Sequence, residues 1–237
     1  MDWYSIKPAT PTRAATINFF GEIGVGRPVE EFIAELGNAP IVELRVDSPG
    51  GSTQAGLAVY DALKGRLAAA TITGRWGSAA IVPVMAAHTI TCIASARILI
   101  HPAVTYVLGN AAQLRHEAFV LEEVAARTVQ IISKRTKQDT ATVRAWMAGE
   151  NYFSATEAFQ MRLIDHIYTQ DQFPARALES SPNLQSPEGS AGGPAQGPTE
   201  AEQMFEAWLA AFGKFQVQDR AAFLQKMSLW ALQNIYE

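Results

Sequence analysis

"VDSPGGSTQAGLAVYDAL", residues 46–63, joins the end of an apolar strand to a helical segment through a turn made of Pro49, Gly50 and Gly51. Pro49 restricts one backbone angle, while the two glycines reach conformations that other residues avoid. Such a turn can present backbone N–H groups ahead of the helix, in the manner of an oxyanion hole. Pro-Gly-Gly also marks ordinary turns, so this stretch alone supports both interpretations.

Strand-like and helix-like patterns alternate on both sides of this turn. The alternation indicates an α/β fold whose strand–helix–strand units pair their strands in parallel through right-handed crossovers. Ser154 and Glu157 have the spacing of a capping box, which predicts a helix start. The expected strands are residues 15–23, 40–51, 70–77, 90–95 and 96–103, and the expected helices are residues 52–67, 79–88, 110–137 and 153–165.

The chain has 237 residues, which predicts one substantial domain and an appendage. Gly, Pro and Ser fill more than half of residues 179–199, which is typical of a flexible linker. After this segment, apolar residues recur at three- and four-residue steps, as in a helical hairpin or a module for oligomerisation or partner docking. We expect an N-terminal extension (1–13), a main domain (14–176), a linker (177–198) and a helical tail (199–237).

The composition argues against several classes of protein. A net charge of −4 gives no general electrostatic reason to bind nucleic acid or an anionic membrane. No apolar run reaches membrane-spanning length and the N-terminus does not resemble a signal peptide, so we expect a cytoplasmic protein. The single Cys92 lies in an apolar stretch and is expected to be a buried hydrophobic residue. No residues suggest a metal or an organic cofactor.

Two further side chains are candidates for chemistry. Ser78, in "GRWGSAAIVPVMAA" (residues 74–87), stands among small residues where a strand turns into a helix. Local evidence favours an ordinary helix cap there, although the same place suits a nucleophile. His101, in "ILIHPA", ends an apolar strand and is either a satisfied core residue or a general base. The ends of neighbouring parallel strands can bring these two groups together.

With Gly50–Gly51, Ser78 and His101 in this order, the main domain resembles the ClpP-type serine peptidases over about residues 17–168. The turn and helix at 46–63, the serine turn, "ARILIHPA" and "YFSATEAFQMRLID" carry the resemblance. It implies a ClpP/crotonase-like fold of repeated strand–helix units, in which the long helix at 110–137 packs subunits together. Phage and prophage ClpP-related proteins, often head maturation proteases, are the most similar branch.

The resemblance also implies catalytic roles. Ser78 would be the nucleophile, and His101 the base that takes its proton. The backbone N–H groups of Gly51 and Ala79 would hold the oxyanion. The family's third catalytic residue, an aspartate, aligns here with Glu150, whose longer side chain requires the backbone to lie further back.

Several positions depart from the family pattern. Asn151 is an alternative to Glu150 as the third group, and a solvated Glu150 without a role is the simpler reading. Trp76 stands where the family has alanine, so its ring could narrow or block a specificity pocket. Pro83 fits only if the following helix starts close by, and Arg162 replaces a glycine.

The leading hypothesis is therefore a serine endopeptidase that cleaves polypeptides inside a homo-oligomeric ring. An ATPase unfoldase, or phage scaffold and capsid proteins within a prohead, would be its partners. The main alternative is a ClpP-like scaffold subunit without activity. Two relatives of the fold are weaker readings: a signal-peptide-peptidase-like enzyme, for which Lys134 or Lys137 would have to serve as the base, and a crotonase-type acyl-CoA enzyme.

Overall fold

The computed structural model describes residues 2–10 and 13–168. The predicted linker (177–198) and helical tail (199–237) lie outside the described residues. Within the described part, no helix is long and apolar enough to cross a membrane.

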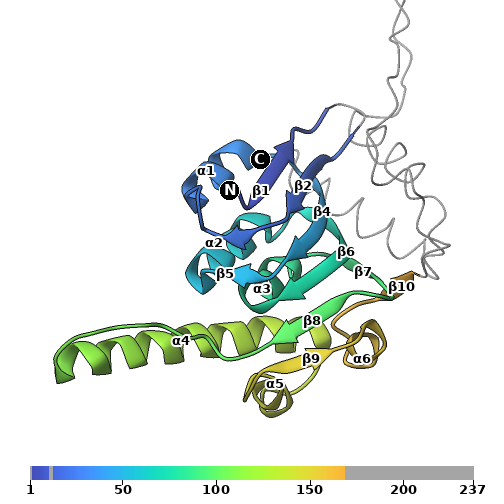
Figure 1. The fold of residues 1–237 in the computed structure, drawn as a ribbon. Coiled ribbons are helices and arrows are strands. Elements are labelled where there is room, and N and C mark those ends of the chain that lie inside the picture. The colour runs from blue at the N-terminus through green and yellow to red at the C-terminus, as the bar shows by residue number, and fades with distance from the viewer. Residues whose placement is uncertain (1, 11–12, 169–237) are drawn as a thin grey trace, which may run out of the picture. The chain divides into compact units, whose positions relative to one another are not determined.

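The centre of the fold is a largely parallel sheet with the order β1-β2-β4-β6-β7-β10 (Figure 1). Strands β2, β4, β6, β7 and β10 run parallel to their neighbours, and only the edge strand β1 pairs antiparallel along this path. These observations confirm the predicted α/β class and its parallel pairing. The bounds are β1 (Tyr4–Lys7), β2 (Ala15–Phe19), β4 (Ile41–Ser48), β6 (Leu67–Gly77), β7 (Thr89–Ile93) and β10 (His166–Tyr168).

The sheet begins earlier than the sequence suggests. We expected residues 1–13 to be an extension, but β1 lies inside them and pairs with β2. Trp3, just before β1, is fully buried and its ring stacks on Phe19 and packs against Phe32. This aromatic contact explains why so short a strand belongs to the domain.

A second group of strands branches from the far half of β6. After pairing with β7 through Ile72, β6 pairs with β8 (Arg97–Ile100) from Arg75 onward. β8 in turn pairs antiparallel with β9 (Asn151–Phe153). The two-residue strands β3 (Glu22–Ile23) and β5 (Gly50–Gly51) form a separate parallel pair.

Four helices lie where the sequence predicts them, with shorter bounds, whereas α1 (Val29–Leu36) and α5 (Thr140–Trp146) are helices that the sequence analysis does not predict. The helix expected at 52–67 ends at Leu63 because β6 begins at Leu67, and the one expected at 79–88 ends at Val84. Asn110 caps the long helix α4 with a full capping box, which agrees with the expected range of 110–137. In Figure 1, α4 extends past the edge of the sheet. The bounds are α1 (Val29–Leu36), α2 (Thr53–Leu63), α3 (Ile81–Val84), α4 (Ala111–Thr136), α5 (Thr140–Trp146) and α6 (Ala155–Gln160).

The last described helix, α6, explains the unusual Arg162. Ser154 and Glu157 form the predicted capping box at its start. At its end, Leu163 N–H donates to Ala158 O and Arg162 N–H donates to Phe159 O, which is the Schellman arrangement. Arg162 has a φ of 60°, in the left-handed region where glycine is usual. The glycine that it replaces therefore has a conformational role.

Replacing Arg162 by glycine should raise the free energy of unfolding by about 0.5–1 kcal/mol. Glycine removes the free-energy cost of the left-handed backbone at this position. This gain exceeds the loss that arises because glycine increases the conformational entropy of the unfolded chain. Thr156→Gly, at an exposed position in the first turn of the same helix, should lower the free energy of unfolding by about 0.3–0.5 kcal/mol. Urea unfolding of both variants measures the difference, and a lower midpoint for Arg162→Gly would contradict the explanation.

Candidate active site

Ser78 lies at the end of β6 and has a backbone conformation rare for serine. Its φ is 52°, in the left-handed region, and it begins the 3-10 turn η1 (Ser78–Ala80) that leads into α3. Gly77, and not Ser78, is the cap of this turn, and no side-chain hydrogen bond caps it. The interpretation of Ser78 as an ordinary helix cap is therefore wrong. A strained, half-buried serine at a strand-to-helix turn is typical of a functional position.

Gly50 packs directly against Ser78. A Cβ atom built on Gly50 would lie 2.6 Å from Ser78 Cβ and 3.1 Å from Ser78 Oγ. Gly50 also has a φ of 126°, which side-chain-bearing residues rarely adopt. Both observations require glycine here, and the turn at 49–51 therefore brings its backbone to the hydroxyl of Ser78.

The two expected oxyanion donors lie on segments that flank this contact. Ser52 N–H donates to Ile23 O, toward β3, at 2.9 Å. Because successive N–H groups of an extended segment point to opposite edges, we expect Gly51 N–H to face away from β3. Ala79 is the second residue of η1, whose first N–H groups have no partner inside the helical turn.

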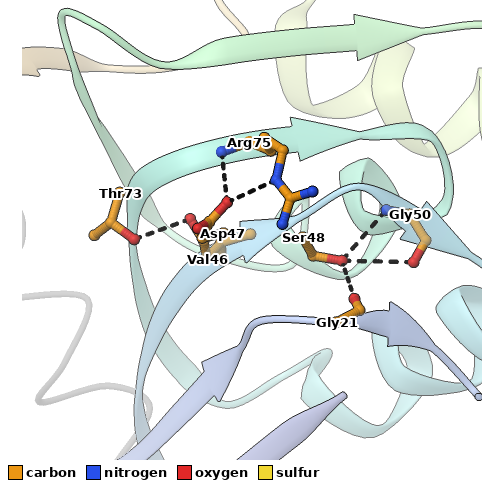
Figure 2. Close-up of polar contacts among 7 residues, drawn as sticks. All are labelled: Gly21, Val46, Asp47, Ser48, Gly50, Thr73 and Arg75. Carbon is orange, nitrogen blue, oxygen red and sulfur yellow. Dashed lines mark hydrogen bonds and ion pairs between the residues drawn. The ribbon is translucent and has the colours of Figure 1, made fainter. Parts of the chain in front are cut away.

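The hydroxyl of Ser48 connects the turn to a neighbouring segment through hydrogen bonds (Figure 2). Ser48 is fully buried, and its Oγ donates to Gly21 O at 2.6 Å and accepts from Gly50 N–H at 3.3 Å. It therefore joins the segment before β3 to the glycine that contacts Ser78. Ser48 is not among the residues predicted to have a role, although a serine just before Pro-Gly-Gly is a signal for such a turn.

His101 follows β8 directly and is half-buried. The β6–β8 register pairs Gly77 with Leu99, so Ser78 and His101 come from the same ends of two neighbouring parallel strands. The prediction that the ends of these two strands are adjacent is thus confirmed. Among the described residues, the structure shows no hydrogen bond that joins Ser78 to His101.

Glu150 and Asn151 lie at the start of β9, across from the end of β8. The ladder pairs Ile100 with Asn151, and the same register continued by one residue aligns His101 with Glu150. Side chains directly opposite each other share one face of a sheet, whereas successive residues alternate. Asn151 Nδ2 donates to Trp146 O at 2.8 Å and to Gly149 O at 3.3 Å, so this amide closes the turn before β9. Glu150 is exposed.

Two other departures from the family pattern have structural explanations. The Trp76 ring is fully buried and its Nε1 donates to Ala80 O at 2.9 Å, so it braces the serine turn from inside. A fully buried ring does not line a surface pocket, so the expectation that Trp76 narrows one is wrong. Pro83 is the third residue of α3, within its first turn, where the missing N–H costs little.

The other reactive groups of the described chain lie outside this arrangement. Cys92 is buried in β7, and burial raises the pKa of its thiol to about 12, which leaves little thiolate. The described residues contain no group of three or more His, Cys, Asp and Glu side chains placed to hold a metal ion.

Comparison with known proteins identifies the class to which this arrangement belongs. The Clp protease family model matches residues 32–171, more than half of the chain, and the chain belongs to this family. The match includes the turn at 49–51, Ser78, His101 and Glu150.

Three curated relatives agree with the family. The chain is 31% identical over 134 residues to the ATP-dependent Clp protease proteolytic subunit 2 of Mycolicibacterium paratuberculosis and, equally, to proteolytic subunit 1 of Mycobacterium leprae. Each match covers 54% of this chain and 66% of the relative. Proteolytic subunit 2 of Tropheryma whipplei is 27% identical over 132 residues, 54% of this chain and 73% of its own.

Ser48→Ala should lower the free energy of unfolding by about 1–3 kcal/mol, because Gly21 O and Gly50 N–H lose their partner in a buried place. Ser5→Ala is the matched control. It removes an exposed hydroxyl that accepts from Asn18, and should change stability by less than about 0.5 kcal/mol. Urea unfolding compares the two variants, and equal effects would show that Ser48 does not support the turn.

Proposed function

We propose that this chain is a serine endopeptidase of the ClpP type. The observation that carries the proposal is the left-handed Ser78, which packs against Gly50 at the end of β6 and lies next to β8, the strand that His101 follows. Membership of the Clp protease family supports a peptidase, and the local geometry supports serine as its nucleophile.

In this mechanism His101 takes the proton of Ser78 Oγ as the hydroxyl oxygen attacks the peptide carbonyl carbon. Gly51 N–H and Ala79 N–H donate to the oxyanion of the tetrahedral intermediate. His101 then gives the proton to the leaving amine nitrogen, the C–N bond breaks, and an acyl-enzyme remains on Ser78. A water molecule, deprotonated by His101, hydrolyses the ester and restores the free hydroxyl.

Glu150 is the third member of the triad in this proposal. The β8–β9 register supports it, because Glu150 aligns with His101 while Asn151 aligns with Ile100. Asn151 also has both hydrogen bonds of its Nδ2 committed to the turn before β9. A carboxylate opposite the imidazole would orient the ring and stabilise its charged form.

The proposal includes self-association through the long helix. The segment before α4 and its first turns expose apolar side chains, and Tyr106 and Leu108 are fully exposed. Val107 and Leu108 line a shallow hollow together with Gln113 and His116 of α4. Large apolar side chains that are exposed next to one another are typical of a protein–protein interface. We propose a homo-oligomeric ring that confines cleavage of polypeptides. An ATPase unfoldase as partner and a role in phage capsid maturation inside a prohead are further parts of this proposal.

A fluorophosphonate probe tests the nucleophile, because it labels only activated serines. We expect one label per chain, located at Ser78 by peptide mass spectrometry. Ser78→Ala and His101→Ala should abolish labelling, whereas Ser95→Ala and His166→Ala, at exposed positions away from these strand ends, should not. A folded wild-type chain without a label would support the alternative of an inactive scaffold subunit.

Glu150→Gln should slow labelling and peptide cleavage by about 100- to 10,000-fold without loss of stability, because the amide no longer stabilises the charged imidazole. Asn151→Ala should instead lower stability, since two carbonyl groups lose their donor. Labelling rates and thermal unfolding separate the two effects. A Glu150→Gln variant with wild-type rates would remove Glu150 from the triad.

A further inference from the structure

The β4–β6 ladder contains a bulge three residues before Ser78. Its register changes from Val46 opposite Ile72 to Ser48 opposite Trp76. Asp47 alone therefore faces three residues of β6, Thr73–Arg75, which we call the β6 bulge. Bulges bend a strand and redirect the residues that follow, and they occur often beside active sites.

Side chains replace the backbone hydrogen bonds that the bulge interrupts (Figure 2). Asp47 Oδ1 accepts from Arg75 N–H at 2.8 Å and from Arg75 Nε at 3.2 Å. Thr73 Oγ1 donates to Val46 O at 3.2 Å. Gly74 leaves room for the carboxylate, because a Cβ there would lie 2.7 Å from Asp47 Cγ. The bulge is thus held by one carboxylate and one hydroxyl.

The bulge lies at the point where β6 changes partners. Ile72, just before it, pairs with β7, whereas Arg75, its last residue, pairs with β8. The same segment pairs Trp76 with Ser48 of β4, next to the turn that contains Gly50. The bulge therefore lies between the part of β6 that pairs with β7 and the part that leads to Ser78, which lies against Gly50 and beside β8.

We propose that Asp47 is a positioning residue, whose carboxylate oxygen fixes the β6 bulge through the backbone N–H of Arg75 and so sets the register of Ser78 against the oxyanion turn. This inference rests on the proposed peptidase function. The ion pair with the guanidinium has a minor role, because the side chains are 49% and 60% exposed and such pairs contribute little. The backbone hydrogen bond is also the shorter of the two.

Three variants of the full chain separate these contributions. Asp47→Ala removes the acceptor, Asp47→Asn keeps an oxygen that accepts from Arg75 N–H, and Arg75→Ala removes the guanidinium but keeps that N–H. The readouts are the labelling rate at saturating fluorophosphonate and the probe concentration that gives half of it. We expect Asp47→Ala to slow the saturating rate about 10- to 100-fold, with a half-saturating concentration within about twofold of wild type, because small displacements of the nucleophile mainly affect the chemical step. Asp47→Asn and Arg75→Ala should stay within about threefold.

An Asp47→Ala variant that reacts at the wild-type rate overturns the proposal, as does an Asp47→Asn or Arg75→Ala variant as slow as Asp47→Ala. If circular dichroism shows that Asp47→Ala does not fold, Thr73→Val takes its place, since it removes the other hydrogen bond at nearly constant volume. We expect it to slow labelling about 10-fold, and a wild-type rate overturns the proposal.

Failure of the proposed function gives a different result, namely a wild-type chain that the probe does not label. Hydrogen exchange then tests the bulge by itself. The Arg75 amide should exchange at least about 10-fold faster in Asp47→Ala than in wild type, because its acceptor is gone. Equal exchange in the two chains would contradict the role of Asp47.

Discussion

The close contact between Gly50 and Ser78 is the constraint on which the rest of the site depends. Ser78 keeps a left-handed backbone that costs a side-chain-bearing residue about 1–2 kcal/mol. Such a conformation persists only where the surroundings impose it. Here Trp76 holds the turn from inside through Ala80 O, and Gly50 leaves no space for Ser78 to move toward it. Packing around the turn thus offsets the cost of the backbone conformation that holds the Ser78 hydroxyl in place.

The same contact connects the sheet to the chemistry. Ser48 Oγ accepts a hydrogen bond from Gly50 N–H in the turn. The β6 bulge lies just before Ser78, on the strand opposite Ser48. Beyond the bulge, β6 joins β8, and β9 adds Glu150 opposite the end of β8. Three strand ends that are distant in sequence therefore meet at one edge, which is where open α/β folds place their sites.

Much of this arrangement could be predicted from the sequence, because its signals are local. The long helix at 110–137 and the helix start at Ser154 follow from periodicity and capping residues, and both are confirmed. The parallel pairing follows from the alternation of strands and helices, and it is confirmed as well. The order of Gly50–Gly51, Ser78 and His101 was sufficient to suggest the family to which the chain belongs.

What the sequence did not reveal depends on contacts between distant residues. The sequence predicts that residues 1–13 are an extension, because the place of β1 in the sheet depends on Trp3 packing on Phe19 and Phe32. The sequence predicts Trp76 at a pocket, whereas its ring is buried in the interior, where its Nε1 donates to Ala80 O. The β6 bulge has no local signal, since Asp47 and Arg75 meet across two strands.

The most direct test of the account is a crystal structure of the full chain after reaction with a fluorophosphonate. The account predicts phosphorus bound to Ser78 Oγ, with a phosphonyl oxygen within about 2.7–3.2 Å of both Gly51 N and Ala79 N. The structure would contradict the account if the adduct lay on another residue. A phosphonyl oxygen directed away from both of these N–H groups would contradict it equally.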